Sequence, residues 1–163
     1  MFREMRRKRQ QLSQDACIQI LTRGTSGTLA VCGDEGYPYA VPLSYVYRDG
    51  RLYFHCGKSG HKLDGLQRSP KVSFCVIDQD QVMPEEYTSY FRSVILFGQA
   101  RILQQEEEIH SAITWLAEKY HPTDSELHRN ETIHLEANRL CMVEIKIEHM
   151  TGKQARELMR QGF

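Results

Sequence analysis

The stretch from residue 28 to residue 57, TLAVCGDEGYPYAVPLSYVYRDGRLYFHCG, decides the fold. It contains three runs rich in apolar, β-branched and aromatic residues, at 28–32, 39–47 and 51–57. Such runs are typical of strands, and turn residues separate them. The Asp49-Gly50 pair suits a type I′ turn, which joins antiparallel neighbours. The stretch therefore predicts an antiparallel meander.

The rest of the chain adds strands and a few helices to this meander. Further strands are expected at residues 71–77, 90–103 and 140–148, and helices at 14–23, 60–68 and 105–120. Residues 78–86 and 123–138 are polar and predict loops, the second with room for one more helix. We expect a mainly β fold, a six-stranded antiparallel split β-barrel, closed or nearly closed, with helical decoration.

Length and composition indicate a single domain over residues 1–163, with a short C-terminal helix at 152–161. The 21 Lys and Arg residues balance the 21 Asp and Glu residues, so a general nucleic-acid binder is not expected. The basic segment at residues 1–10 is interpreted as a solvated arm. No secretory apolar region follows it, and no run approaches the roughly 18 residues of a membrane span.

The five cysteines are odd in number and form no CxxC pair, and most of them lie in apolar, strand-like runs. There they serve as small buried hydrophobic residues, so a disulfide framework is not expected. We therefore expect a cytoplasmic location. None of the seven histidines shows a recognised metal-ligand spacing, so no metal site is predicted.

The segment at residues 57–62, GKSGHK, marks a candidate anion site. Lys58, His61 and Lys62 surround the first turn of the helix expected at 60–68. Cations are mildly unfavourable at that end of the helix dipole, unless an anion occupies its free N–H groups. A phosphate fits, with Ser59 completing the cradle, whereas a solvated basic turn is the alternative that the spacing leaves open.

Two further features lie within expected strands. Pro42 cannot donate to a sheet ladder, so it belongs at an edge or a bulge, where free backbone groups could bind the edge of a planar heterocycle. Arg92 and Ser93 open an otherwise apolar strand, where they either meet a ligand or partner subunit or lie on an exposed face.

Several phrases, taken in order, resemble the pyridoxamine 5′-phosphate oxidase-like split-barrel family, most of all its nitroimidazole-resistance branch. The phrases are YPY at 37–39, VPL at 41–43, DGRLYFH at 49–55, GHK at 60–62, SPKVSF at 69–74, RSV at 92–94, GQA at 98–100 and EHMTGK at 148–153. The resemblance covers about residues 10–153. It implies a homodimer with FMN bound between the subunits.

The resemblance also implies roles for individual residues. Backbone groups of Val41, Pro42, Leu43 and Ser44 would line the isoalloxazine edge, and Phe54, His55 and Cys56 would flank the ring and the ribityl chain. His61 and Lys62 would hold the phosphate, and His61 is the candidate catalytic residue. Arg92 and Ser93 would come from the second subunit.

The implied function is an FMN-dependent oxidoreductase of flavin reductase or nitroreductase type, with NADH or NADPH as donor and a small organic molecule as substrate. Oxidases of vitamin B6 carry an arginine where His61 stands and an Arg-rich, Trp-containing C-terminal segment. Here the single tryptophan is Trp115, in an expected helix, so that activity is disfavoured. Two alternatives stay open. The protein could be a carrier or sensor without catalytic turnover. Its cofactor could be FAD, a deazaflavin or haem in place of FMN, and His61 or His149 would then bind the haem iron.

Overall fold

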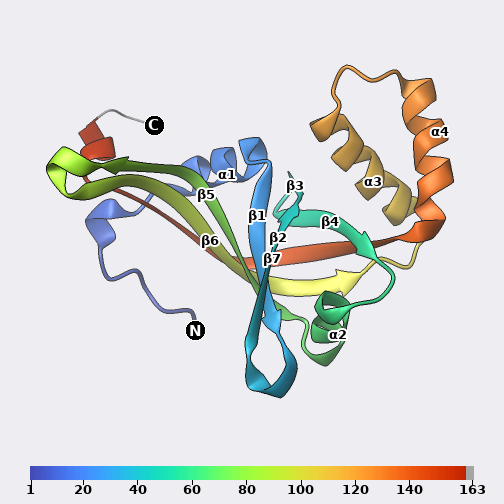
Figure 1. Ribbon diagram of the computed structural model, residues 1–163, viewed down its shortest axis with the longest axis horizontal. Coiled ribbons are helices and arrows are strands. Elements are labelled where there is room, and N and C mark those ends of the chain that lie inside the picture. The colour runs from blue at the N-terminus through green and yellow to red at the C-terminus, as the bar shows by residue number, and fades with distance from the viewer. Residues whose placement is uncertain (161–163) are drawn as a thin grey trace.

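The computed structural model describes residues 1–160, in which seven strands form one antiparallel sheet (Figure 1). The strands are β1 Ser26–Cys32, β2 Pro38–Ser44, β3 Val46–Arg48, β4 Arg51–Gly57, β5 Lys71–Met83, β6 Thr88–Ile102 and β7 Leu140–Gln154. Their order across the sheet is β2-β1-β5-β6-β7-β4-β3. The predicted six-stranded barrel is therefore wrong in its strand number and in its closure, because no ladder joins β2 to β3 in this order.

A single residue, Tyr45, links the two edge strands and breaks the strand predicted at 39–47. Because consecutive Cα atoms are only about 3.8 Å apart, the sheet must curl until its two edges meet at this corner. The Tyr45 side chain is fully buried, and its hydroxyl donates to the Leu21 carbonyl at 2.9 Å. The Tyr45 N–H donates to the Tyr120 hydroxyl at 3.0 Å, so a turn-like corner keeps its backbone donor satisfied.

Within residues 1–160, four α-helices surround the sheet: α1 Gln14–Arg23, α2 His61–Arg68, α3 Glu106–Tyr120 and α4 Glu126–Glu136. The first three confirm the predicted helices, and Ser13 caps α1 by accepting from the Ala16 N–H at 3.1 Å. Figure 1 shows α1 and α2 at opposite ends of the curled sheet. The α4 helix lies in the polar stretch at 123–138, where the sequence predicts a loop with room for one more helix.

Two hydrophobic clusters hold these layers together. The larger one fills the curl of the sheet, with α1 contributing Cys17, Ile20 and Leu21, none of which is exposed. The smaller one joins α3 and α4 to the other face of the sheet, through Ile113, Ile133 and their neighbours. The α3–α4 hairpin is thus attached to β4 and β7 from outside the curl.

The turn predicted at Asp49-Gly50 is confirmed, and a bulge lies at Gly98. Asp49 and Gly50 have φ values of 46° and 77°, as a type I′ turn requires, and they connect β3 to β4. The ladder between β6 and β7 shifts register between Phe97 and Gly98. A Cβ on Gly98 would lie 2.3 Å from the Lys146 carbonyl oxygen, so only glycine permits this close approach.

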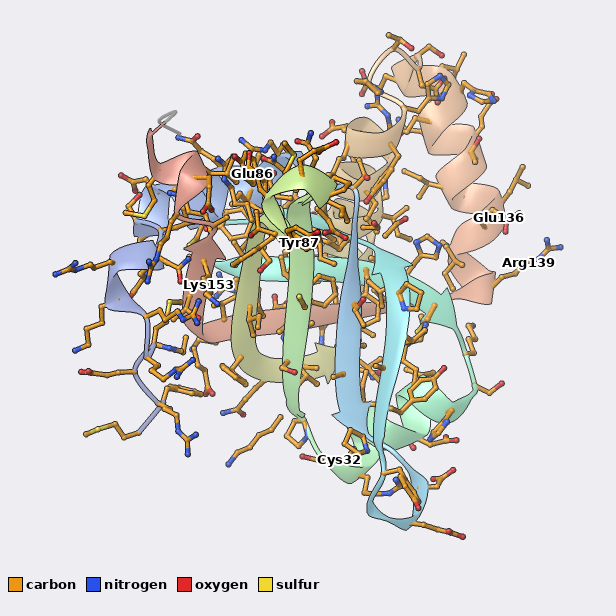
Figure 2. All side chains as sticks on the ribbon, turned by 60° about the vertical axis from the view of Figure 1, so that its left-hand side comes forward. Cys32, Glu86, Tyr87, Glu136, Arg139 and Lys153 are labelled. Atoms are coloured by element: carbon orange, nitrogen blue, oxygen red, sulfur yellow. The ribbon has the colours of Figure 1, made fainter. Side chains whose placement is uncertain are left out.

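The loop predicted at residues 78–86 is wrong for residues 78–83, which continue β5 and pair with β6 in a two-stranded ribbon, while residues 84–86 form the turn at its tip. Figure 2 shows Glu86 and Tyr87 at the tip of this ribbon. Most side chains at its tip are exposed, so the sequence lacks the alternation that marks a half-buried strand.

The C-terminal helix predicted at 152–161 is also wrong. Strand β7 continues to Gln154 and only a short 3-10 helix follows, at Glu157–Arg160, while residue 161 lies outside the described residues. The basic arm is largely exposed up to Arg9, with a 3-10 turn at Lys8–Gln10. Within residues 1–160, no helix is both long and apolar enough to cross a membrane.

Lys119 supports the Tyr45 corner and makes its stability depend on pH. The Lys119 ammonium donates to the carbonyls of Tyr45, at 3.0 Å, and Gly24, and lies 4.3 Å from the centre of the Tyr45 ring. Burial lowers the pKa of Lys119 from 10.5 to about 8. Between these two values the unfolded chain holds the proton that the folded chain has released, so stability rises with pH across this window.

We expect the free energy of unfolding of the wild-type protein, relative to that of Lys119→Met, to increase by on the order of 2–3 kcal/mol as the pH rises from 8 to 10.5. Urea unfolding of both proteins at several pH values measures this difference, and the variant serves as the control for all other titrating groups. A difference that stays constant over the window would contradict the lowered pKa of Lys119.

Candidate functional site

The α2 helix lies near two free sheet edges, since it packs on β2 and its Lys62 lies near Phe54 of β4. Strand β2 is one edge, and β3 pairs only with residues 51–53 of β4, so residues 54–57 have no neighbour on that side. The helix lies directly on β1 and β2. Its close fit depends on Gly65, where a Cβ would lie 2.9 Å from the Cys32 carbonyl oxygen. The edge position predicted for Pro42 is confirmed, since β2 pairs only with β1.

A polar cluster ties α2 to the turn between β1 and β2. Arg68 donates to the Cys32 carbonyl at 3.2 Å, to the Gly33 carbonyl, and to the Asp34 carboxylate at 2.8 Å. The Arg68 guanidinium, and then His61, lower the pKa of Asp34. The turn and the helix therefore form one unit.

The His61 side chain belongs to the same cluster. Its ring stacks on Tyr39 with centroids 4.1 Å apart, and its Nε2 lies 3.5 Å from an Asp34 carboxylate oxygen. Sequence reasoning missed Tyr39, Asp34 and Arg68 as partners of this site. The turn residues between the runs at 28–32 and 39–47 predicted only a connection between strands, and nothing local in the sequence links Asp34 to a helix that begins 27 residues further on.

The start of α2 carries N–H groups that no side chain caps. Gly60 adopts φ 124° and ψ 167°, a conformation essentially restricted to glycine, and nothing lies within 4 Å of the place where its Cβ would be. The N–H groups of Leu63 and Asp64 donate to the Gly60 carbonyl. Those of His61 and Lys62 have no acceptor among the described residues, so they can receive an anion.

Lys62 directs positive charge at the end of β4. Its ammonium lies 6.0 Å from the centre of the Phe54 ring. Partial desolvation, and then the Lys62 charge, lower the pKa of His55. Burial raises the pKa of the Cys56 thiol to about 11, against the opposing effect of Lys62. The pKa values of His55 and Cys56 are thus both lowered by the charge of the Lys62 ammonium.

The strand residues predicted to bind ligand fall into two groups. Phe54 and Cys56 face the core, with 0% and 8% of their surface exposed, and Val41 and Leu43 also pack against it. Pro42, Ser44 and His55 are exposed. A ligand at the two edges would therefore meet the buried residues mainly through backbone groups, and the exposed ones through side chains as well.

The structure does not bring Arg92 and Ser93 to α2. Both lie in the first half of β6. Arg92 pairs with Asp78 at 3.3 Å and with the Gln154 side chain at 3.2 Å. His149 is also remote from the α2 cluster in its contacts, since its ring stacks on Phe2 at 4.7 Å.

The comparisons with known proteins agree with this architecture. The sequence model of the family described as pyridoxamine 5′-phosphate oxidase matches residues 13–154. The chain therefore belongs to this family. No curated protein sequence matches it.

Three solved structures illustrate the shared fold. A candidate 5-nitroimidazole antibiotic resistance protein from Bacteroides thetaiotaomicron is 20% identical, with a TM-score of 0.74, and the match covers 88% of this chain and 86% of that one. A conserved hypothetical protein from Mycobacterium tuberculosis is 23% identical, with a TM-score of 0.78 and coverages of 96% and 93%. An FAD-binding protein from Mesorhizobium loti is 25% identical, with a TM-score of 0.63 and coverages of 89% and 96%.

The backbone of Gly60 makes a prediction about the helix start. Gly60→Ala should destabilise the protein by about 1–3 kcal/mol, because alanine strongly disfavours the Gly60 conformation. Gly57→Ala, at the last residue of β4, is the matched control, because its added Cβ would meet nothing closer than 3.9 Å. Thermal and urea unfolding measure both variants, and equal losses would show that the conformation of Gly60 is not the cause.

Proposed function

We propose that this protein is an FMN-dependent oxidoreductase, of flavin reductase or nitroreductase type, that acts on a small organic molecule with NADH or NADPH as donor. The observation that carries the proposal is the uncapped start of α2, with Lys62 beside it, at the opening between two free strand edges. Membership of the pyridoxamine 5′-phosphate oxidase family supports it.

The residues present fit the phosphate end of FMN. The free N–H groups of His61 and Lys62 suit phosphate oxygens, and the open space at Gly60 leaves room for them. Lys62 supplies a cation that holds phosphate as a point charge. Because Asp34 and Tyr39 engage the His61 ring, the backbone N–H of His61 is the group we assign to the phosphate.

The two strand edges suit the planar part of the cofactor. Backbone groups of β2 at Val41–Ser44 and of β4 at residues 54–56 would orient the ring. Bound FMN supplies the chemistry of accepting and donating a hydride, and the protein supplies binding, orientation and limited access. FAD-binding by the Mesorhizobium loti protein supports a flavin, and FAD stays the alternative to FMN.

We also propose that the protein acts as a homodimer. The outward face of β1, β5 and β6 carries three large exposed apolar side chains: Ile77, Ile95 and Phe97, which are 65%, 43% and 40% exposed. Small residues extend this face, because Thr28 and Cys75 lie in one row with Ile95. A contiguous apolar sheet face of this kind is typical of a protein–protein interface.

Ser93 lies on this outward face, and Arg92 on the opposite one. Side chains alternate along a strand, so Ser93 points to the same side as Ile95. Arg92 points toward α1, where Asp78 also binds Arg23. Of the two residues predicted to reach the second subunit, Ser93 has the suitable orientation, whereas Arg92 would have to leave Asp78.

The first functional prediction concerns the phosphate. Lys62→Ala should weaken FMN binding by at least about tenfold, because it removes a charge-assisted contact worth roughly 1.5–3 kcal/mol. Riboflavin, which lacks the phosphate, should lose far less. Fluorescence titration with both ligands measures the difference. The matched control is Lys146→Ala, an exposed lysine on β7.

Equal losses for FMN and riboflavin would refute the phosphate role of Lys62. A purified protein that is colourless and gains no flavin absorbance with FMN or FAD would overturn the flavin proposal itself. A haem spectrum would instead favour the haem alternative. Anaerobic mixing with NADH and NADPH then separates an oxidoreductase from a carrier, since a carrier is not reduced.

The second functional prediction concerns the dimer. Ile95→Glu places a charge on the apolar face, so we expect a monomer of unchanged helix and strand content that binds FMN much more weakly. Light scattering after size exclusion gives the mass, and titration gives the affinity. Leu127→Glu on α4 is the control, because Leu127 is 72% exposed and lies off this face. A dimer that survives Ile95→Glu would place the interface elsewhere.

A further inference from the structure

Two of the five cysteines lie directly opposite each other in the sheet. Cys56 on β4 pairs in register with Cys141 on β7, and the nearby Cys141 thiol contributes to the raised pKa of Cys56. Directly opposite residues of an antiparallel pair have Cα atoms about 4.5–5.5 Å apart, which lies within the range that a disulfide spans. The ladders pair the cysteines of β1 and β5 with other residue types: Cys32 lies opposite Pro38, and Cys75 opposite Thr28 and Ile95.

The two thiols differ in their access to solvent. Cys56 is buried, whereas Cys141 is only partly buried at the first residues of β7. Burial, and then Cys141, raise the pKa of Cys56 to about 11, so Cys56 stays a thiol at neutral pH. Cys141 is therefore the residue that meets a dissolved oxidant first.

We propose that Cys56 and Cys141 form a redox-active dithiol that hydrogen peroxide converts to an intrachain disulfide and that small thiols restore. The sulfur of Cys141, as thiolate, attacks a peroxide oxygen, the O–O bond breaks, and water leaves after taking up a proton. The sulfur of Cys56 then attacks the resulting sulfenic sulfur, and the second oxygen leaves as water with the proton of Cys56. Two thiols and one peroxide yield one disulfide and two waters.

The position of the pair gives this modification a structural consequence. The disulfide would connect the end of β4, directly before the loop that leads into α2, to the start of β7. It would close a long segment of chain, which constrains the unfolded state most strongly. Disulfide formation itself does not depend on flavin binding, so a failure of the proposed function would leave it intact.

Mass spectrometry tests the proposal on the full chain. Reduced protein is treated with a slight excess of hydrogen peroxide, free thiols are alkylated, and the chain is digested with trypsin. Cleavage at Arg51, Lys58, Arg139 and Lys146 isolates the two cysteines in separate short peptides, 52–58 and 140–146. We expect these two peptides to be joined by a disulfide and to separate on treatment with dithiothreitol. We also expect the melting temperature of the oxidised protein to be about 5–10 °C higher than that of the reduced protein.

Three variants control the result. Cys141→Ser should leave Cys56 open to alkylation only after unfolding, and Cys56→Ser should leave Cys141 as a sulfenic acid that dimedone traps. Neither should show the rise in melting temperature. Cys75→Ser should behave as wild type, because Cys75 lies on β5. The proposal is overturned if Cys56 and Cys141 both remain free after excess peroxide, or if either joins a different cysteine.

Discussion

The Tyr45 corner is the constraint on which the rest of the structure depends. One residue carries the chain from β2 to β3, so the two edges of a seven-stranded sheet are held together at a single point. The corner is fixed from both sides, because Leu21 of α1 accepts from the Tyr45 hydroxyl, while Lys119 and Tyr120 of α3 bond to its backbone. Burial of an aromatic ring with a satisfied hydroxyl makes such a corner stable. The curl of the sheet, the core inside it and the placement of α1 all follow.

The same corner creates the opening that becomes the candidate site. Because β3 begins only at Val46, opposite Tyr53, residues 54–57 of β4 continue past the corner without a neighbour on that side. The α2 helix packs on β1 and β2 near these edges. It is held there by the Arg68–Asp34 pair and by the close approach of Gly65 to β1. Two strand edges with free backbone groups and one uncapped helix start are thereby placed together. A fully closed barrel would have used those backbone groups in its own ladder.

Local signals in the sequence predicted the parts of this fold that depend on local chemistry. The Asp49-Gly50 turn and the basic start of α2 are each determined by residues within a few positions of one another. The β5–β6 ribbon was missed because a strand pair outside the core needs no alternation. The contacts of His61 with Tyr39 and Asp34 depend on two segments that only the tertiary fold brings together. The break at Tyr45 was missed because residues 39–47 have continuous strand propensity, which tertiary packing overrides.

Charge distribution explains how a chain with no net charge could select a phosphate-bearing ligand. Asp34 offsets His61 and Arg68 on one side of α2, so these three groups serve to hold the helix on the sheet. Neither Lys58 nor Lys62 forms an ion pair with any of the described residues, and both lie at the positive end of the helix dipole. Local potential, rather than net charge, governs which ligand approaches a surface. The same balance predicts selectivity for an anion that can also present a flat apolar surface to the strand edges, because the charges alone would accept any phosphate.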